Sequence, residues 1–233
     1  MANKTKSSNI VVGLDIGTSK VVCIVGKFVE DRLEIIALGA YPSSGLKKGV
    51  VVNIDATTDA ISKAVEQAQS MIEEKIKSVF VGIAGNHIKS LNSQGAVGIK
   101  DKEVTSYDID RVIDSAQAVS IPSDQRVLHV LPQEFVIDGQ EVSLDPLGMS
   151  GVRLEAKVHL VTCSNSAIKN IEKCIKNCGL GVQGFVLEQL ASSHSILSDD
   201  EKDLGVCLVD IGGGTTDIAI FNSGSIVFTG VIP

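Results

Sequence analysis

The sequence contains no tryptophan and few other aromatic residues: six phenylalanines and two tyrosines among 233 residues. Aromatic side chains are the platforms on which proteins stack nucleic-acid bases. Basic residues are also in deficit, with 21 Lys and Arg against 28 Asp and Glu, which gives a net charge of −7. The basic residues are scattered, whereas a phosphate backbone is bound by clustered Lys and Arg. We therefore expect no nucleic-acid partner.

Long hydrophobic runs are absent as well. The best candidate, from Ile10 to Gly26, is interrupted by Asp15 and Lys20, and a membrane span needs roughly 18 apolar residues. The first residues, MANKTKSSN, are polar and lead into no apolar signal core. The sequence therefore predicts a cytoplasmic protein.

Cysteine is present without a metal-binding pattern. There are five cysteines, an odd number, and most lie in apolar runs, as is typical of reduced and buried thiols. Cys174 and Cys178 are spaced to share a helix face, but the sequence has no CxxC and its four histidines are dispersed. A metal site built on these cysteines is therefore not favoured. We expect the histidines to be structural or exposed: His87, His129, His159 and His194.

The chain reads as alternating strands and helices. Three apolar strand patterns open it, and an amphipathic helix is predicted from about Asp55 to Ile76, capped by Asp55 or Thr57. Residues 86 to 163 show a different pattern: short strands, one helix near 106–119 and long strands in which polar residues alternate with apolar ones. This block is interpreted as a subdomain inserted into the first domain.

Two segments of the chain resemble each other. VVGLDIGTSKVVCIVG and LVDIGGGTTDIAIF both place an apolar strand before Asp-Ile-Gly, then small hydroxyl residues, then a second apolar strand. The aspartates are Asp15 and Asp210. This weak internal repeat predicts two domains of related topology.

The turns of the repeat have the chemistry of a phosphate site. Tight turns rich in Gly, Ser and Thr aim several backbone N–H groups in one direction and bind anions. An aspartate at the end of the preceding strand can orient a hydrated Mg²⁺, or can simply cap the turn. Either turn alone is an ordinary hairpin turn; together they favour a clamp around the phosphates of one nucleotide. The residues predicted to line the phosphates are Gly17, Thr18, Ser19, Gly212, Gly213, Gly214 and Thr215.

Neither turn matches the Walker A or the Rossmann pattern, since there is no GK[ST] and no GxGxxG that opens a helix. Instead, VGLDIGTSK and LVDIGGGTTDIAIF resemble the two phosphate motifs of the actin, Hsp70 and sugar-kinase superfamily. Within it the chain resembles the FtsA family of bacterial cell-division proteins over essentially its whole length. The segments that carry this resemblance are VVNIDATTDAISKAV, VFVGIAGNHIKS, RVLHVLPQEFVIDG, GMSGVRLEAKVHLVTC and DLGVCLVDIGGGT.

The resemblance implies an α/β, actin-like (ribonuclease H-like) ATPase fold, with a mixed sheet flanked by helices and an inserted small α+β subdomain. It implies a disordered tail over 1–9, subdomain 1A over 10–85 and 164–197, and subdomain 1C over 86–163. Residues 198–233 would begin a truncated subdomain 2A. The adenine motif, the surface that docks FtsZ and an amphipathic membrane helix are expected beyond Pro233.

The resemblance also assigns roles to single residues. It implies that ATP and Mg²⁺ are the cofactors, with Asp15 and Asp210 contacting Mg²⁺ through water. Lys20 either reaches a phosphate or remains a solvated strand residue. Glu188 occupies the place of a polar residue that orients attacking water, or is a carboxylate at a helix N-terminus.

The implied function is that of a cytoskeletal ATP-binding adaptor that polymerises and links the FtsZ ring to the membrane and to later division proteins. Residues 86–163 would contact those later proteins, and the full-length protein would lie at the cytoplasmic face of the inner membrane, at the division site. ATP hydrolysis would be slow or absent, so enzymatic activity stays open. The alternatives are a pilus-assembly ATP-binding protein and a small-molecule kinase of the same superfamily.

Overall fold

The computed structural model describes residues 10–30, 32–142 and 145–232; the predicted tail over 1–9 lies outside them. The chain forms two compact units. Unit 1 contains the residues up to Ile83, those from Lys169 to Val186 and the short segment Gly212–Gly214. Unit 2 contains the remainder: Ala84–Ile168, Leu187–Ile211 and the residues from Thr215 onward.

Unit 1 is built on one mixed sheet with the strand order β11-β6-β1-β2-β3. The first three strands form an antiparallel meander, as their apolar patterns predict, and β6 pairs with β1 in parallel. The elements of this unit are β1 (Ile10–Ile16), β2 (Lys20–Val29), β3 (Arg32–Pro42), β4 (Leu46–Lys47), β5 (Val50–Val51), α1 (Ile54–Gln69), β6 (Ser78–Ile83), most of α3 (Asn165–Asn177) and β11 (Gly181–Leu187).

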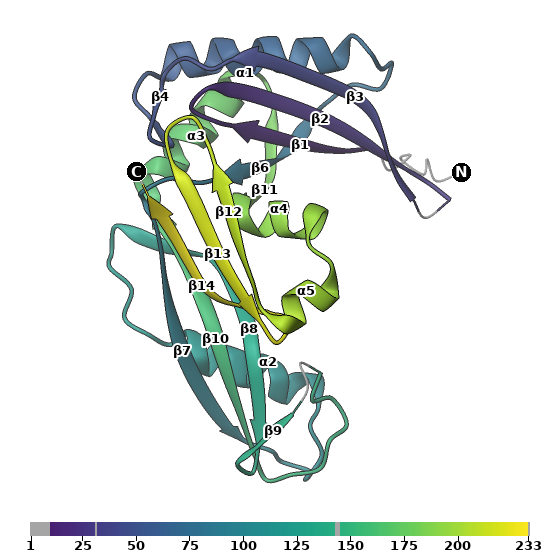
Figure 1. Cartoon of the computed structure of the whole chain (residues 1–233), viewed down its shortest axis with the longest axis vertical. Coiled ribbons are helices and arrows are strands. Elements are labelled where there is room, and N and C mark those ends of the chain that lie inside the picture. The colour runs from purple at the N-terminus through teal and green to yellow at the C-terminus, as the bar shows by residue number, and fades with distance from the viewer. Residues whose placement is uncertain (1–9, 31, 143–144, 233) are drawn as a thin grey trace, which may run out of the picture. The chain divides into compact units, whose positions relative to one another are not determined.

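Helix α1 lies along one face of β2 and β3 (Figure 1). Its cap is Asn53 rather than Asp55 or Thr57, because the Asn53 Oδ1 accepts the Ala56 N–H at 3.0 Å. It ends at Gln69 and not at Ile76. The Gln69 side chain accepts the Ile76 N–H at 2.8 Å, so this amide replaces the predicted last turn of helix with a closed loop.

Unit 2 holds two antiparallel sheets. One has the strand order β7-β10-β8-β9 and the other β12-β13-β14. The elements are β7 (Ile88–Gly98), α2 (Ser106–Gln117), β8 (Gln125–Ile137), β9 (Gln140–Val142), β10 (Arg153–Ser164), α4 (Glu188–Ile196), α5 (Asp199–Leu204), β12 (Val206–Ile211), β13 (Thr216–Asn222) and β14 (Ser225–Ile232). The short strands predicted at the start of residues 86–163 are a single strand, β7, and α5 was not predicted.

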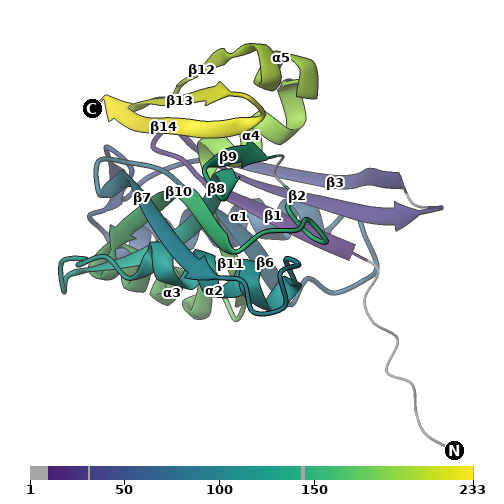
Figure 2. The same cartoon turned by 90° about the horizontal axis from the view of Figure 1, so that it is seen from below.

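Helix α2 covers one face of the β7-β10-β8-β9 sheet, and β14 lies on the opposite face (Figure 2). Buried apolar side chains fill the space under the helix, among them Val112, Phe135 and Leu154. The contacts of β14 with this sheet join residues 86–163 to most of residues 198–233 in one compact unit, although the two segments were predicted as separate subdomains. The predicted subdomain boundaries stay predictions.

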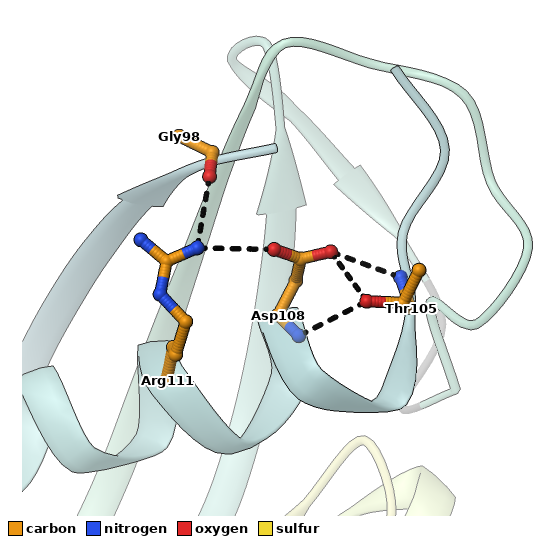
Figure 3. Close-up of polar contacts among 4 residues, drawn as sticks. All are labelled: Gly98, Thr105, Asp108 and Arg111. Carbon is orange, nitrogen blue, oxygen red and sulfur yellow. Dashed lines mark hydrogen bonds and ion pairs between the residues drawn. The ribbon is translucent and has the colours of Figure 1, made fainter. Parts of the chain in front are cut away.

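The start of α2 is fixed by a polar network (Figure 3). Thr105 caps the helix, and the Asp108 carboxylate returns to accept the Thr105 N–H at 3.2 Å and hydroxyl at 2.6 Å. The hydrogen bond from that hydroxyl lowers the pKa of Asp108. Arg111 donates to Asp108 at 3.1 Å and to the carbonyl of Gly98 at 3.3 Å. These bonds tie α2 to the end of β7.

A buried histidine joins the two sheets of unit 2. His159 of β10 is 2% exposed, and its ring nitrogens lie 2.7 Å from the Asn92 Oδ1 and 3.0 Å from the Thr229 Oγ1. Since a carboxamide oxygen only accepts, Nδ1 carries the proton and Nε2 accepts the Thr229 hydroxyl. Burial lowers the pKa of His159 to about 4.

This lowered pKa makes unit 2 sensitive to acid. A histidine whose pKa falls on folding contributes stability that is fully present above its unfolded pKa, about 6.5, and is lost as the pH falls through the folded pKa. We expect that lowering the pH from 7 toward 4 removes about 3 kcal/mol of unfolding free energy through His159. Urea unfolding of His159→Gln should show a flatter pH profile than the parent. The exposed-site variant His194→Gln should follow the parent, and parallel profiles for all three proteins would contradict the assignment.

Candidate functional site

The first predicted phosphate turn connects β1 to β2. Its N–H at Gly17 donates to the Lys20 carbonyl at 3.0 Å, and the Ser19 carbonyl accepts the Ser43 N–H at 3.0 Å. A Cβ on Gly17 would lie 3.0 Å from the Lys20 carbonyl oxygen, so the turn is tight enough to favour glycine. Thr18 is half-buried, whereas Ser19 and Lys20 are exposed.

The second turn, Gly212–Gly214, lies against the first. Both belong to unit 1. A Cβ on Gly213 would lie 2.8 Å from the Ser19 Cβ, and one on Gly214 would lie 2.7 Å from the Thr18 Oγ1. The backbone of the second turn therefore contacts the side chains of the first, and only glycine permits this approach. The structure thus brings together four of the predicted phosphate residues: Thr18, Ser19, Gly213 and Gly214.

The residues that flank the second turn belong to unit 2 and are held by a buried aspartate. Asp217 of β13 is 4% exposed. It accepts the Gln189 side-chain amide and the Thr215 hydroxyl, both at 3.0 Å. Burial raises the pKa of Asp217, and the nearby Asp210 carboxylate raises it further. Asp210 itself accepts the Ser192 hydroxyl at 3.3 Å.

This network changes what Thr215 can offer a ligand. A hydroxyl has a single proton, and that of Thr215 is donated to Asp217. The oxygen of Thr215 therefore presents only acceptor capacity, which suits a cation or a water and not a phosphate oxygen. Its backbone N–H is the group that fits the predicted contact with phosphate.

Asp217 was not among the predicted site residues. The signal for it was present, because Asp217, Ala219 and Phe221 alternate along β13 on its buried face. A carboxylate on the buried face of a strand needs partners, and its position two residues after Thr215 directs it to this turn.

Glu188 is the first residue of α4. The preceding residue, Leu187, donates its N–H to the His129 Nε2 at 2.9 Å. A carboxylate in the first turn of a helix is stabilised by the helix dipole. This accounts for Glu188 structurally, and its role toward water stays a prediction. Its neighbour Gln189 is fully buried, and its Oε1 has no hydrogen-bond partner within the described ranges.

A divalent cation would find water-mediated contacts here and not a preformed cage. Within residues 10–30, 32–142 and 145–232, no three His, Cys, Asp or Glu side chains are grouped so as to hold a metal ion. Asp15 and Asp210 are each half-buried at the end of a strand. Single carboxylates that contact the hydration shell are the way Mg²⁺ is usually held beside phosphates. Each of these two carboxylates, taken by itself, therefore suits contact with a hydrated Mg²⁺.

The cysteines form no such site either. Cys174 lies in α3, but Cys178 follows the last residue of that helix and does not share its face as predicted. Their partners are carbonyls and a hydroxyl: the Cys178 Sγ donates to the Thr58 carbonyl at 3.4 Å and accepts from Ser62 at 3.3 Å. Burial raises the pKa of both thiols. As expected, most of the cysteines are withdrawn from solvent: Cys23, Cys163 and Cys174 are buried and Cys178 is half-buried, whereas Cys207 is exposed. No helix in the described part of the chain has the length and apolar character of a membrane span.

Comparison with known proteins identifies the inserted sheet. Residues 85–162 match the domain family described as the SHS2 domain inserted in FTSA. The cell division protein FtsA of Pseudomonas aeruginosa is 62% identical over 229 residues, which cover 98% of this chain and 55% of the relative. FtsA of Escherichia coli K12 is 45% identical over 99% of this chain and 55% of the relative. The chain thus spans about half the length of the curated relatives it matches.

Solved structures confirm the predicted fold. The PilM–PilN type IV pilus biogenesis complex aligns with a TM-score of 0.69 at 14% identity, over 95% of this chain and 61% of that one. The ethanolamine utilization protein EutJ from Carboxydothermus hydrogenoformans aligns with a TM-score of 0.54 at 14% identity, over 97% of this chain and 53% of that one. At such identities the likeness concerns the fold alone. With its actin-like ATPase fold, its match to the SHS2 domain and these sequence identities, the chain is similar over nearly its whole length to the FtsA cell division proteins.

Proposed function

We propose that the chain is the part of an actin-like cell-division protein that binds the phosphates of ATP and carries the SHS2 contact domain. Sequence similarity to FtsA supports the role in division, because the curated relatives are named as cell division proteins. The observation that carries ATP binding is the contact of the two glycine turns, where Gly213 and Gly214 approach Ser19 and Thr18 too closely for any other residue.

In this proposal the backbone N–H groups of Gly212–Gly214 bind the phosphate oxygens, because such turns present several donors to one anion. Gly17 keeps the first turn tight, since its own N–H is donated to the Lys20 carbonyl. Asp15 and Asp210 hold the hydration shell of Mg²⁺, which supplies positive charge to the phosphates when it is bound. The Thr215 oxygen, whose proton is committed to Asp217, accepts from that shell. Each of these residues binds or orients, and none is assigned a bond-breaking step.

Titration with ATP and Mg²⁺ tests the proposal. In ¹⁵N–¹H spectra of the chain we expect the amides of Gly17, Gly213 and Gly214 to shift together, and to shift less when EDTA removes Mg²⁺. Glycines remote from the turns, such as Gly139, serve as internal controls. Absence of any shift at the two turns at millimolar ATP would rule out phosphate binding by this chain.

For the longer family protein we propose self-association into filaments, attachment to the FtsZ ring and the membrane, and contact with later division proteins through the SHS2 domain. Exposed apolar side chains on that domain fit a contact role: Tyr107, Leu147 and Val152 are 61%, 56% and 64% exposed. Arg111 is not included in this contact surface, because its guanidinium already donates to the Asp108 carboxylate and to the Gly98 carbonyl. Surface substitutions at these three apolar residues in the longer protein should weaken binding of later division proteins and leave co-sedimentation with FtsZ filaments unchanged.

A further inference from the structure

A two-residue hairpin turn lies against the first phosphate turn. In the β4–β5 hairpin, Leu46 pairs with Val51 and Lys47 with Val50, so Lys48 and Gly49 form the loop. Both have left-handed backbones, with φ of 52° and 74°. Positive φ at both loop residues defines a type I′ turn, which matches the twist of its strands. The Gly49 N–H donates to the Thr18 Oγ1 at 3.3 Å.

The hairpin is anchored at its base as well as at its tip. The Gly45 carbonyl accepts the N–H groups of Val52 and Asn53 at 2.8 and 3.1 Å. A Cβ on Gly45 would lie 2.5 Å from the Thr57 Oγ1, so the base is packed against the first turn of α1. The position of the Lys48–Gly49 turn relative to Thr18 is therefore fixed by bonds at both ends of the hairpin.

The bond from Gly49 decides how the Thr18 hydroxyl is used. Because its oxygen accepts the Gly49 N–H, its own proton points elsewhere and can be donated. Thr18 also lies beside Gly214 of the second turn. The Thr18 hydroxyl thus keeps a proton that it can donate to an anion, whereas the proton of the Thr215 hydroxyl is already donated to Asp217.

The same turn provides positive charge. Lys47 and Lys48 are exposed, and neither forms an ion pair with a carboxylate within the ranges that the structure describes. The Lys48 ammonium is carried on a flexible four-carbon chain, so it can reach a ligand that is bound beside Thr18. In a chain with a net charge of −7, local cations are needed to attract a polyphosphate.

We propose that the Lys48–Gly49 turn is a third wall of the phosphate site and that it selects nucleoside di- and triphosphates over monophosphates. Gly49 orients the Thr18 hydroxyl toward a terminal phosphate, and the Lys48 ammonium pairs with that phosphate. This inference rests on the proposed function and deepens it, because it assigns specificity to a hairpin outside both glycine turns.

The variant Lys48→Asn tests the wall without disturbing the turn. Asn-Gly is the preferred type I′ sequence, so the backbone should be kept while the charge is lost. We expect binding of ATP, followed by NMR titration, to weaken about tenfold, as for loss of a charge-assisted phosphate contact. Binding of AMP should be unchanged. Lys27→Asn, which removes an exposed charge from β2, is the matched control and should bind both nucleotides as the parent does.

The outcomes separate this inference from the proposed function. If ATP shifts the glycine turns equally in the parent and in Lys48→Asn, phosphate binding stands and the third wall is wrong. Equal losses for ATP and AMP also overturn it, since they would show a structural effect. If the parent chain binds neither ATP nor ADP, the proposed function fails and this inference fails with it.

Discussion

Replacing Gly213 by alanine is expected to weaken binding of ATP and Mg²⁺ about a hundredfold while the chain stays folded. The added Cβ would lie 2.8 Å from the Ser19 Cβ and 3.4 Å from the Ser19 N. Real Cβ atoms do not approach so closely, so the two turns must separate. Overpacking of this kind costs about 3 kcal/mol, and we expect it to appear as lost affinity because the exposed turns can move apart without disrupting the sheets.

Two further variants make this result specific. Gly213 does not have a positive φ, so alanine fits its backbone and only the contact is changed. Ser19→Gly removes the opposing Cβ, and the double variant Ser19→Gly/Gly213→Ala should recover most of the affinity. Gly98→Ala, where an added Cβ meets nothing within 4 Å, should bind as the parent does. Unchanged affinity in Gly213→Ala alone would show that the contact between the turns is irrelevant to the ligand.

Local patterns in the sequence predicted the strands and the two turns well, because each depends on neighbouring residues. In both phosphate motifs an Asp-Ile-Gly turn follows an apolar strand, and the structure places a tight turn at Gly17 and at Gly212–Gly214. The same local logic misplaced the limits of α1. Its end depends on the Gln69 side chain, which closes a loop back to Ile76, and nothing in helical periodicity reports such a side-chain bond.

Contacts between distant residues were beyond the sequence alone. Gly49 reaches Thr18 across 31 positions, and Gln189 reaches Asp217 across 28. Each bond exists because strands bring the two segments together, so the orientation of the hydroxyls of Thr18 and Thr215 became visible only in the structure. The predicted phosphate residues were therefore a set of candidates, and their donor and acceptor roles required the fold.

A second large effect is expected from Gly95→Ala in the SHS2 domain. Gly95 lies in β7 beneath α2, and an added Cβ would lie 2.5 Å from the Val112 carbonyl and 2.9 Å from the Ala116 Cα. These are helix backbone atoms, so the whole helix must lift from the sheet and expose part of the core around Val112 and Phe135. We expect a loss of about 3 kcal/mol of unfolding free energy, seen as a lower urea midpoint with an unchanged m-value.

Gly98→Ala is the matched control in the same strand, since its Cβ would meet open space, and its stability should stay within about 0.5 kcal/mol of the parent. A shift confined to Gly95→Ala would show that the distance between α2 and β7 limits the stability of this domain. Equal shifts in both variants would show instead that any added side chain weakens the strand. In that case the close packing of α2 over β7 would not be what sets the stability of the SHS2 sheet.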